Sequence, residues 1–183
     1  MRIIGGEFKG RKIEYPEFKT VRPTKDRIRE AVFNMIAEWV PGARVLDLFA
    51  GSGAYGLESL SRGALELVLV DNDARCAEVI EKNVSTLKIK NKAKVLTDDV
   101  FEAIPILSNS KERFDIVFAD PPFNKEMAKK TLITINHYDI LNRPSLLILE
   151  HSRNEAVPEE EGSAIISRQK TYKDILISLY IKR

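Results

Sequence analysis

The sequence predicts an α/β fold in which a mostly parallel sheet carries helices on both faces. Five apolar runs are the candidate strands, at residues 44–49, 65–70, 93–97, 114–119 and 145–150. Segments of helical character lie between and beside them, at residues 54–62, 73–88, 100–108 and 125–136. The runs are almost continuous in Val, Ile and Leu, which is typical of parallel strands buried on both faces and joined by right-handed crossovers. With 183 residues, the chain can form one domain with a small extension.

Residues 1–22 are expected to form a basic N-terminal extension, and residues 23–183 the main domain. Glycines punctuate the start of the chain between apolar residues, which predicts a short β-hairpin. Residues 1–29 contain nine Lys or Arg and four acids, whereas the rest of the chain has a net charge of −3. A basic segment on a mildly acidic body is suited to a polyanion, although a solvated charged surface would look the same.

An amphipathic helix is expected to follow this extension. Thr24, after Pro23, is the expected N-cap, and apolar residues recur at spacings of three and four from Ile28 to Trp39. The helix should end before Pro41.

The C-terminal part is expected to close the sheet with two antiparallel strands. Residues 164–167 and 175–180 are the candidate strands, and a turn region separates them. The acidic stretch at residues 158–162 is expected to be a loop.

Several classes of protein are excluded by composition. We expect a soluble, cytoplasmic protein, because the N-terminus lacks an apolar signal-peptide core and no apolar run of membrane-spanning length occurs. The sequence does not indicate an oligomeric state, and a monomer is the default expectation. The single cysteine, Cys76, cannot form an internal disulfide. The only histidines, His137 and His151, lack companion ligands, so no metal site is expected.

A glycine-rich loop follows the first candidate strand. Gly51, Gly53 and Gly56 satisfy the pattern G-x-G-x-x-G, so a nicotinamide or flavin dinucleotide must be considered. Asp47 argues against one, because its carboxylate would lie near the pyrophosphate and repel it. The same carboxylate suits the ammonium and sulfonium groups of S-adenosylmethionine.

Acidic residues also follow the second and third candidate strands. Asp71 is placed to accept hydrogen bonds from a ribose diol. Asp99, after Asp98, could accept from an adenine amino group, while the Val100 N–H could donate to the ring nitrogen beside it. Each acid could instead be an N-cap or turn residue. The complete set of candidate cofactor residues is Asp47, Phe49, Gly51, Ser52, Gly53, Asp71, Asn72, Asp99 and Val100.

The fourth candidate strand ends in Asp120-Pro121-Pro122-Phe123. The Asp120 carboxylate and the Pro121 carbonyl can each accept one N–H bond from a planar NH2 group. The two proline rings stiffen the turn, and Phe123 can stack on a base. Asp120, Pro121 and Phe123 are therefore the candidate catalytic residues. An ordinary proline turn is the alternative when this motif is taken alone.

These motifs resemble those of the class I S-adenosylmethionine-dependent N-methyltransferases, which have a Rossmann-like fold. The segments Arg22–Asn34 and Gly56–Ala64 narrow the resemblance to the RsmD-type small-subunit rRNA guanine-N2 methyltransferases, and the similarity spans almost the whole chain. Tyr55 departs from the family pattern, because a smaller or aliphatic residue is usual there. Asp71 replaces the more usual Glu, and the final third has few matching positions.

The resemblance implies an activity and a partner. The protein would methylate the N2 amine of a guanine in 16S rRNA, either free or within a 30S assembly intermediate. The basic N-terminal part would steer the RNA, and the candidate contacts are Arg22, Lys25, Arg27, Arg29 and Phe123. Two alternatives remain open: methylation of another planar amine, such as adenine N6 or a glutamine amide, and a non-catalytic ribosome-assembly factor with this fold.

Overall fold

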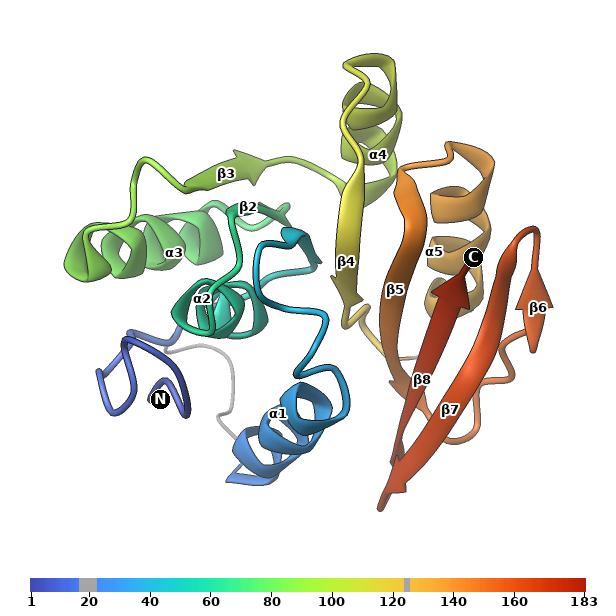
Figure 1. Ribbon diagram of the computed structural model, residues 1–183, viewed down its shortest axis with the longest axis horizontal. Helices are drawn as coiled ribbons and strands as arrows, with labels where there is room; N and C mark the ends of the chain where they lie inside the picture. The colour runs from blue at the N-terminus through green and yellow to red at the C-terminus, as the bar shows by residue number, and fades with distance from the viewer. Residues whose placement is uncertain (17–22, 124–125) are drawn as a thin grey trace.

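The computed structural model describes residues 1–16, 23–123 and 126–183. Within them, one eight-stranded sheet has the order β3-β2-β1-β4-β5-β8-β7-β6 (Figure 1). Its strands are β1 Arg44–Leu48, β2 Glu66–Asp71, β3 Ala93–Thr97, β4 Phe114–Ala119, β5 Leu141–Ser152, β6 Glu160–Glu161, β7 Ala164–Tyr172 and β8 Ile175–Lys182. The helices are α1 Pro23–Met35, α2 Ala54–Ser61, α3 Ala74–Leu87, α4 Val100–Asn109 and α5 Met127–His137.

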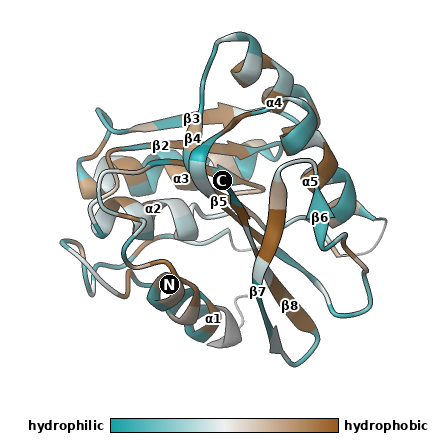
Figure 2. Cartoon of the chain, turned by 45° about the vertical axis from the view of Figure 1, so that its right-hand side comes forward, coloured by the Kyte–Doolittle hydropathy of each residue, from teal (hydrophilic) through white to brown (hydrophobic). Residues whose placement is uncertain are grey.

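The five strands from β3 to β5 are mutually parallel, and β8, β7 and β6 continue the sheet in antiparallel pairing. The predicted α/β architecture and the predicted C-terminal antiparallel pair are therefore confirmed. The predicted loop at residues 158–162 contains β6, whose two residues pair with the start of β7. Figure 2 shows hydrophobic residues along β8 and hydrophilic residues on β6, which is the outermost strand.

Two apolar cores lie on opposite faces of the sheet. The first joins α1, α2 and α3 to strand residues such as Val45, Leu69 and Phe118. The second joins α4 and α5 to Leu46 and Val70. Adjacent residues of one strand belong to different cores because side chains alternate between the faces. The prediction of helices on both faces is confirmed.

The N-terminal segment resembles a hairpin but has only one isolated antiparallel bridge among its described residues, between Arg2 and Lys12. Ile3 and Ile13 are buried in the same core as α1, α2 and α3. The segment thus packs against the main domain. The predicted boundary at residue 22 lies outside the described residues and stays a prediction.

Helix α1 differs from its predicted bounds. It begins at Pro23, so Thr24 lies inside the helix and the N-cap prediction is wrong. The helix ends at Met35, although the apolar pattern continues to Trp39. Ile36 and Val40 are still buried there. Buried apolar residues therefore continue past the end of the helix, where residues 36–40 form a non-helical turn.

No helix in the described part of the chain combines the length and apolar character needed to cross a bilayer.

Candidate functional site

A cavity of about 570 Å³ lies at the carboxyl ends of β1, β2 and β4. The strand order reverses between β1 and β4, which is where open α/β sheets bind their ligands. Eleven of the predicted cofactor and catalytic residues line this cavity: Asp47, Phe49, Gly51, Ser52, Asp71, Asn72, Asp99, Val100, Asp120, Pro121 and Phe123. The sequence motifs, which are spread over more than 70 positions, are thus brought together in one place.

Of the five described acidic residues that line the cavity, Asp99 precedes α4 and the other four come from four neighbouring strands. Asp47 and Asp71 lie on β1 and β2, while Asp120 directly follows β4 and Glu150 lies on β5. In each strand, the residue two positions earlier packs in the core formed with α1, α2 and α3. Because side chains two residues apart share a face, the four carboxyl groups are directed to that side of the sheet. The cavity is consequently rich in carboxyl groups, and the buried Arg29 also lines it.

Asp47 is the most deeply perturbed of these groups. Its side chain is 3% exposed, and its Oδ2 accepts a hydrogen bond of 2.9 Å from the Gly56 N–H at the start of α2. Burial raises the pKa of Asp47 to about 8; the Gly56 hydrogen bond opposes this, whereas the charges of Asp120 and Asp71 add to it. A cation in the cavity would favour the charged form. The site therefore suits a positively charged ligand.

Asp71 holds the glycine loop against β2. Its Oδ2 accepts a hydrogen bond of 2.7 Å from the Gly51 N–H, and its Oδ1 accepts one of 3.0 Å from the Asp73 N–H. A carboxylate oxygen can accept more than one hydrogen bond, so these two bonds do not exclude a contact with a ligand hydroxyl. Gly53, by contrast, does not line the cavity among the described residues. It has φ 75°, and a Cβ there would lie 2.8 Å from Leu69 Cδ2, so Gly53 shapes the loop.

Asp99 combines the two roles that the sequence left open. It is the N-cap of α4, because its Oδ1 accepts a hydrogen bond of 2.8 Å from the Phe101 N–H. Its exposed side chain also lines the cavity, beside Val100. The capping role therefore does not exclude a ligand contact.

The Asp120-Pro121-Pro122-Phe123 motif forms the wall beyond β4. Pro121 is buried, whereas Phe123 is 38% exposed. A rigid, buried proline fixes the position of its own carbonyl group and of Asp120. The exposed aromatic ring leaves a face on which a planar group could stack.

Among the cavity residues that were not predicted as site residues, several have side chains that could contact a ligand through an aromatic ring, a thioether or a carboxyl group, including Tyr15, Tyr55, Met127 and Glu150. The Tyr55 ring stacks on Phe118 with the ring centroids 5.0 Å apart, and its hydroxyl donates to Glu150 Oε2 at 3.4 Å. Burial raises the pKa of Tyr55 well above its usual value, and the charge of Glu150 adds to the effect. The sequence contains one indication of a role for Tyr55: a tyrosine stands in the glycine-loop segment where the family usually has a smaller or aliphatic residue.

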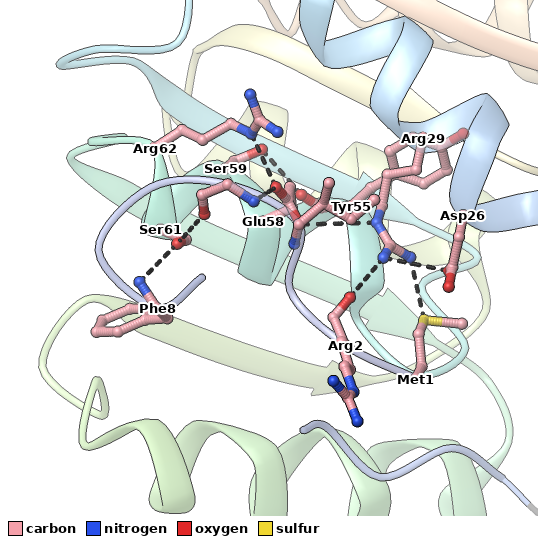
Figure 3. A network of polar contacts seen from close by, with 12 residues as sticks. Met1, Arg2, Phe8, Asp26, Arg29, Tyr55, Glu58, Ser59, Ser61 and Arg62 are labelled. Carbon is pink, nitrogen blue, oxygen red and sulfur yellow. Dashed lines mark hydrogen bonds and ion pairs between the residues drawn. The ribbon is translucent and has the colours of Figure 1, made fainter. Parts of the chain in front are cut away.

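Arg29 is the centre of a buried polar network (Figure 3). It is 2% exposed and donates to the Arg2 carbonyl at 2.7 Å and to Met1 Sδ at 3.1 Å. It forms ion pairs with Asp26 at 3.3 Å and with Glu58 at 3.7 Å. The network therefore joins the N-terminus, α1 and α2.

Glu58 connects the same network to the N-terminal backbone. Its carboxylate is fully buried and accepts hydrogen bonds from the N–H groups of Ile4 at 2.8 Å and Gly5 at 2.7 Å. The Ser61 hydroxyl adds bonds to Gly5 and Phe8. These contacts hold the N-terminal segment where Met1 and Tyr15 become part of the cavity wall.

The predicted RNA contacts are only partly described by the structure. Arg29 is buried and held by this network, yet it lines the cavity, so its predicted contact with RNA stays a prediction. Arg27 is exposed on α1. Arg22 and the side chain of Lys25 lie outside the described residues.

The match to known proteins covers almost the whole chain. A family model described as "Conserved hypothetical protein 95" matches residues 1–181. The chain belongs to this family. A Bacillus subtilis member, "Putative rRNA methyltransferase YlbH", is 35% identical over 100% of both chains. "Ribosomal RNA small subunit methyltransferase D" of Escherichia coli is 35% identical over 98% of this chain and 89% of that protein. The resemblance to the RsmD family is confirmed.

Solved structures agree with the family assignment. The E. coli structure described as "Putative methyltransferase yhhF" has a TM-score of 0.86 and 33% identity, and covers 100% of this chain and 98% of that chain. A Thermus thermophilus 16S rRNA N2 G1207 methyltransferase, in complex with AdoMet and guanosine, has a TM-score of 0.69 and 26% identity over 91% of this chain and 45% of that chain. The predicted fold class of this chain is confirmed. Its predicted cofactor, S-adenosylmethionine, is confirmed as well.

Among residues 1–16, 23–123 and 126–183, no three His, Cys, Asp or Glu side chains are grouped to hold a metal ion. The expectation that the reaction uses no metal stays a prediction.

Proposed function

We propose that this protein transfers a methyl group from S-adenosylmethionine to the exocyclic N2 amine of a guanine in small-subunit ribosomal RNA. The observation that carries this proposal is the shared cavity of Asp47, Asp71, Asp99 and Asp120-Pro121-Pro122-Phe123. Relatives that carry rRNA methyltransferase names support the RNA substrate. The protein would act in the cytoplasm as a monomer, on free RNA or on a 30S assembly intermediate.

The proposed cofactor residues surround the part of the cavity formed by β1, β2 and β3. Asp47 would balance the cationic charge of the cofactor, Asp71 would accept from the ribose hydroxyls, and Asp99 with the Val100 N–H would bind the adenine edge. When bound, S-adenosylmethionine supplies an electrophilic methyl group on a sulfonium.

The proposed catalytic residues act on the amine. The N2 lone pair of guanine is delocalised into the ring, so the amine is a weak nucleophile. The Asp120 carboxylate and the Pro121 carbonyl would each accept one N–H bond, which localises electron density on nitrogen and aligns it for in-line attack. Phe123 would hold the base by stacking. One amine proton leaves after the new C–N bond forms, and the Asp120 carboxylate could accept it.

Methyl transfer from labelled S-adenosylmethionine to pools of rRNA, DNA and protein tests this function. We expect label in small-subunit rRNA, located on a guanine N2 by mass spectrometry of the digested nucleosides. Label in adenine or in glutamine would favour methylation of another planar amine. No cofactor binding by calorimetry would favour a non-catalytic assembly factor.

Asp120→Ala tests the assigned residue. It should lower the rate of methyl transfer by about 100-fold or more, because it removes one preorganised acceptor of the developing charge. Glu81→Gln, an exposed carboxylate change on α3, is the matched control. Near-normal transfer by Asp120→Ala that still binds the cofactor would show that the role given to Asp120 is wrong.

A further inference from the structure

Glu150 lies on the side of Asp120 that the predicted cofactor residues do not occupy. Asp47 and Asp71 come from β1 and β2, whereas Glu150 belongs to β5, on the other side of β4. Ala119, the last residue of β4, pairs in register with Leu149 of β5, so Asp120 directly follows one paired residue and Glu150 the other. Neighbouring strands are separated by about 4.8 Å. A group held by Asp120 is thus within reach of Glu150.

The Glu150 side chain is held in a defined position in the cavity wall. It is 3% exposed and lines the cavity. Tyr55 is a positioning residue for it, since the Tyr55 hydroxyl contacts Glu150 Oε2 at 3.4 Å and the ring is fixed by stacking on Phe118. In such a buried setting, a polar group of the ligand that cannot pair with a carboxylate is strongly disfavoured.

The edge of guanine that carries N2 also carries the N1–H donor beside it. A carboxylate can only accept hydrogen bonds, and adenine has an acceptor at N1 instead of a donor. We propose that Glu150 determines base specificity by accepting the N1–H of the target guanine, while Asp120 and the Pro121 carbonyl hold the N2 amine. This inference rests on the proposed function, and it explains how a motif that reads any planar NH2 group selects guanine.

The test compares guanine with 2-aminopurine at the methylated position of a reconstituted small-subunit RNA. 2-Aminopurine keeps the exocyclic 2-amine but has an acceptor at N1. The wild-type protein should methylate guanine about 10- to 100-fold faster, which is the effect of one hydrogen bond to a charged group. Glu150→Gln should reduce this preference to about threefold or less, because an amide can either accept from guanine N1–H or donate to N1 of 2-aminopurine.

Two further variants separate base recognition from a merely structural role. Tyr55→Phe keeps the Glu150 carboxylate and removes the hydroxyl that positions it, so it should lower the rate of transfer to guanine while guanine stays preferred over 2-aminopurine. Glu150→Asp keeps an acceptor and should also retain the preference at a lower rate. Cofactor binding and thermal unfolding are measured for every variant, so that a loss of folding is recognised.

The outcomes distinguish this inference from the function on which it rests. Equal rates on guanine and 2-aminopurine by the wild-type protein would overturn the role of Glu150, even if Glu150→Gln did not fold. Equal losses on both bases in Glu150→Gln would also overturn it. If the wild-type protein methylates no guanine in rRNA, the proposed function itself fails.

Discussion

Asp47 and Asp120 share one cavity, where burial raises the pKa of Asp47 to about 8 and the charge of Asp120 adds to this rise. Asp47 is therefore mostly protonated at pH 7 in the ligand-free protein. A cationic ligand beside it favours the ionised form. Binding of the cofactor is consequently linked to the release of a proton.

This linkage predicts that the affinity for S-adenosylmethionine rises as the pH rises toward about 8, by at most about tenfold per pH unit. Calorimetry at pH 7 in buffers with different ionisation enthalpies would measure the released proton. Asp47→Asn should bind more weakly and should lose this part of the pH dependence. Titration of the ligand itself affects wild type and variant equally. The same dependence of affinity on pH in both proteins would therefore contradict the linkage.

The same pKa predicts an effect on folding in the absence of ligand. An aspartate whose folded pKa is raised from 3.8 to about 8 keeps a proton that the unfolded chain has lost over that range. Its contribution to the free energy of unfolding therefore falls as pH rises from about 4 to about 8, by at most about 1.4 kcal/mol per unit. Asp47→Asn should gain stability relative to wild type between pH 5 and pH 8, as measured by urea unfolding. An unchanged difference at the two pH values would show that burial does not perturb Asp47.

A comparison of Gly53 with Gly10 separates two costs of an alanine at Gly53: backbone strain and steric overlap. Both have positive φ, 75° and 83°, but a Cβ at Gly53 would lie 2.8 Å from Leu69 Cδ2, whereas nothing lies within 4 Å at Gly10. Gly10→Ala should lower the free energy of unfolding by about 1 kcal/mol, through backbone strain alone. Gly53→Ala should lower the free energy of unfolding by about 1–3 kcal/mol more, because the added methyl group overlaps Leu69. It should also weaken cofactor binding, because the loop is displaced. Similar urea midpoints for the two variants would mean that Leu69 moves aside.

The central sheet and its acidic edge could be predicted because both depend on local pattern. Asp71 and Asp120 each follow a short apolar run and Asp47 lies near the end of another, and parallel strands deliver their ends to one edge. Glu150 could not be recognised in the same way, because it lies within the strand that the sequence predicts at residues 145–150 and no distinctive motif follows it. Its side chain faces the cavity only through the register of β5 with β4, and one sequence does not specify register.

The burial of Arg29 was not predicted, because its charge alone made it a candidate RNA contact. It precedes Val32, Phe33 and Ile36 by three, four and seven residues, so it lies on the buried face of α1. Its partners, Met1, Arg2 and Glu58, are distant in the sequence and meet only in the folded chain. Helical periodicity could have indicated its burial, but not the groups that neutralise it.

Phe123 is predicted to act on the substrate with little effect on folding. Its ring is 38% exposed, so Phe123→Ala should change the melting temperature little, while the loss of base stacking, about 1–3 kcal/mol, should lower kcat/KM for RNA by about 10- to 100-fold. Phe123→Tyr keeps a stacking face and should retain most activity. Ile106→Ala, at an exposed residue of α4 outside the cavity lining, is the control. Normal kcat/KM in Phe123→Ala would remove the stacking role.

Arg27 and Arg29 are two residues apart on α1, yet they are predicted to respond in opposite ways. Arg27 is exposed, so Arg27→Ala should leave thermal stability unchanged and reduce the slope of log affinity for RNA against log salt by about one. Arg29 is buried beside Glu58, so Arg29→Met should lower the free energy of unfolding by about 2–4 kcal/mol and leave that slope unchanged. Fluorescence anisotropy with labelled rRNA at several salt concentrations, together with urea unfolding, measures both quantities. A reduced slope in Arg29→Met with normal stability would favour the predicted contact of Arg29 with RNA, because a buried ion-pair partner cannot be removed without a cost in folding.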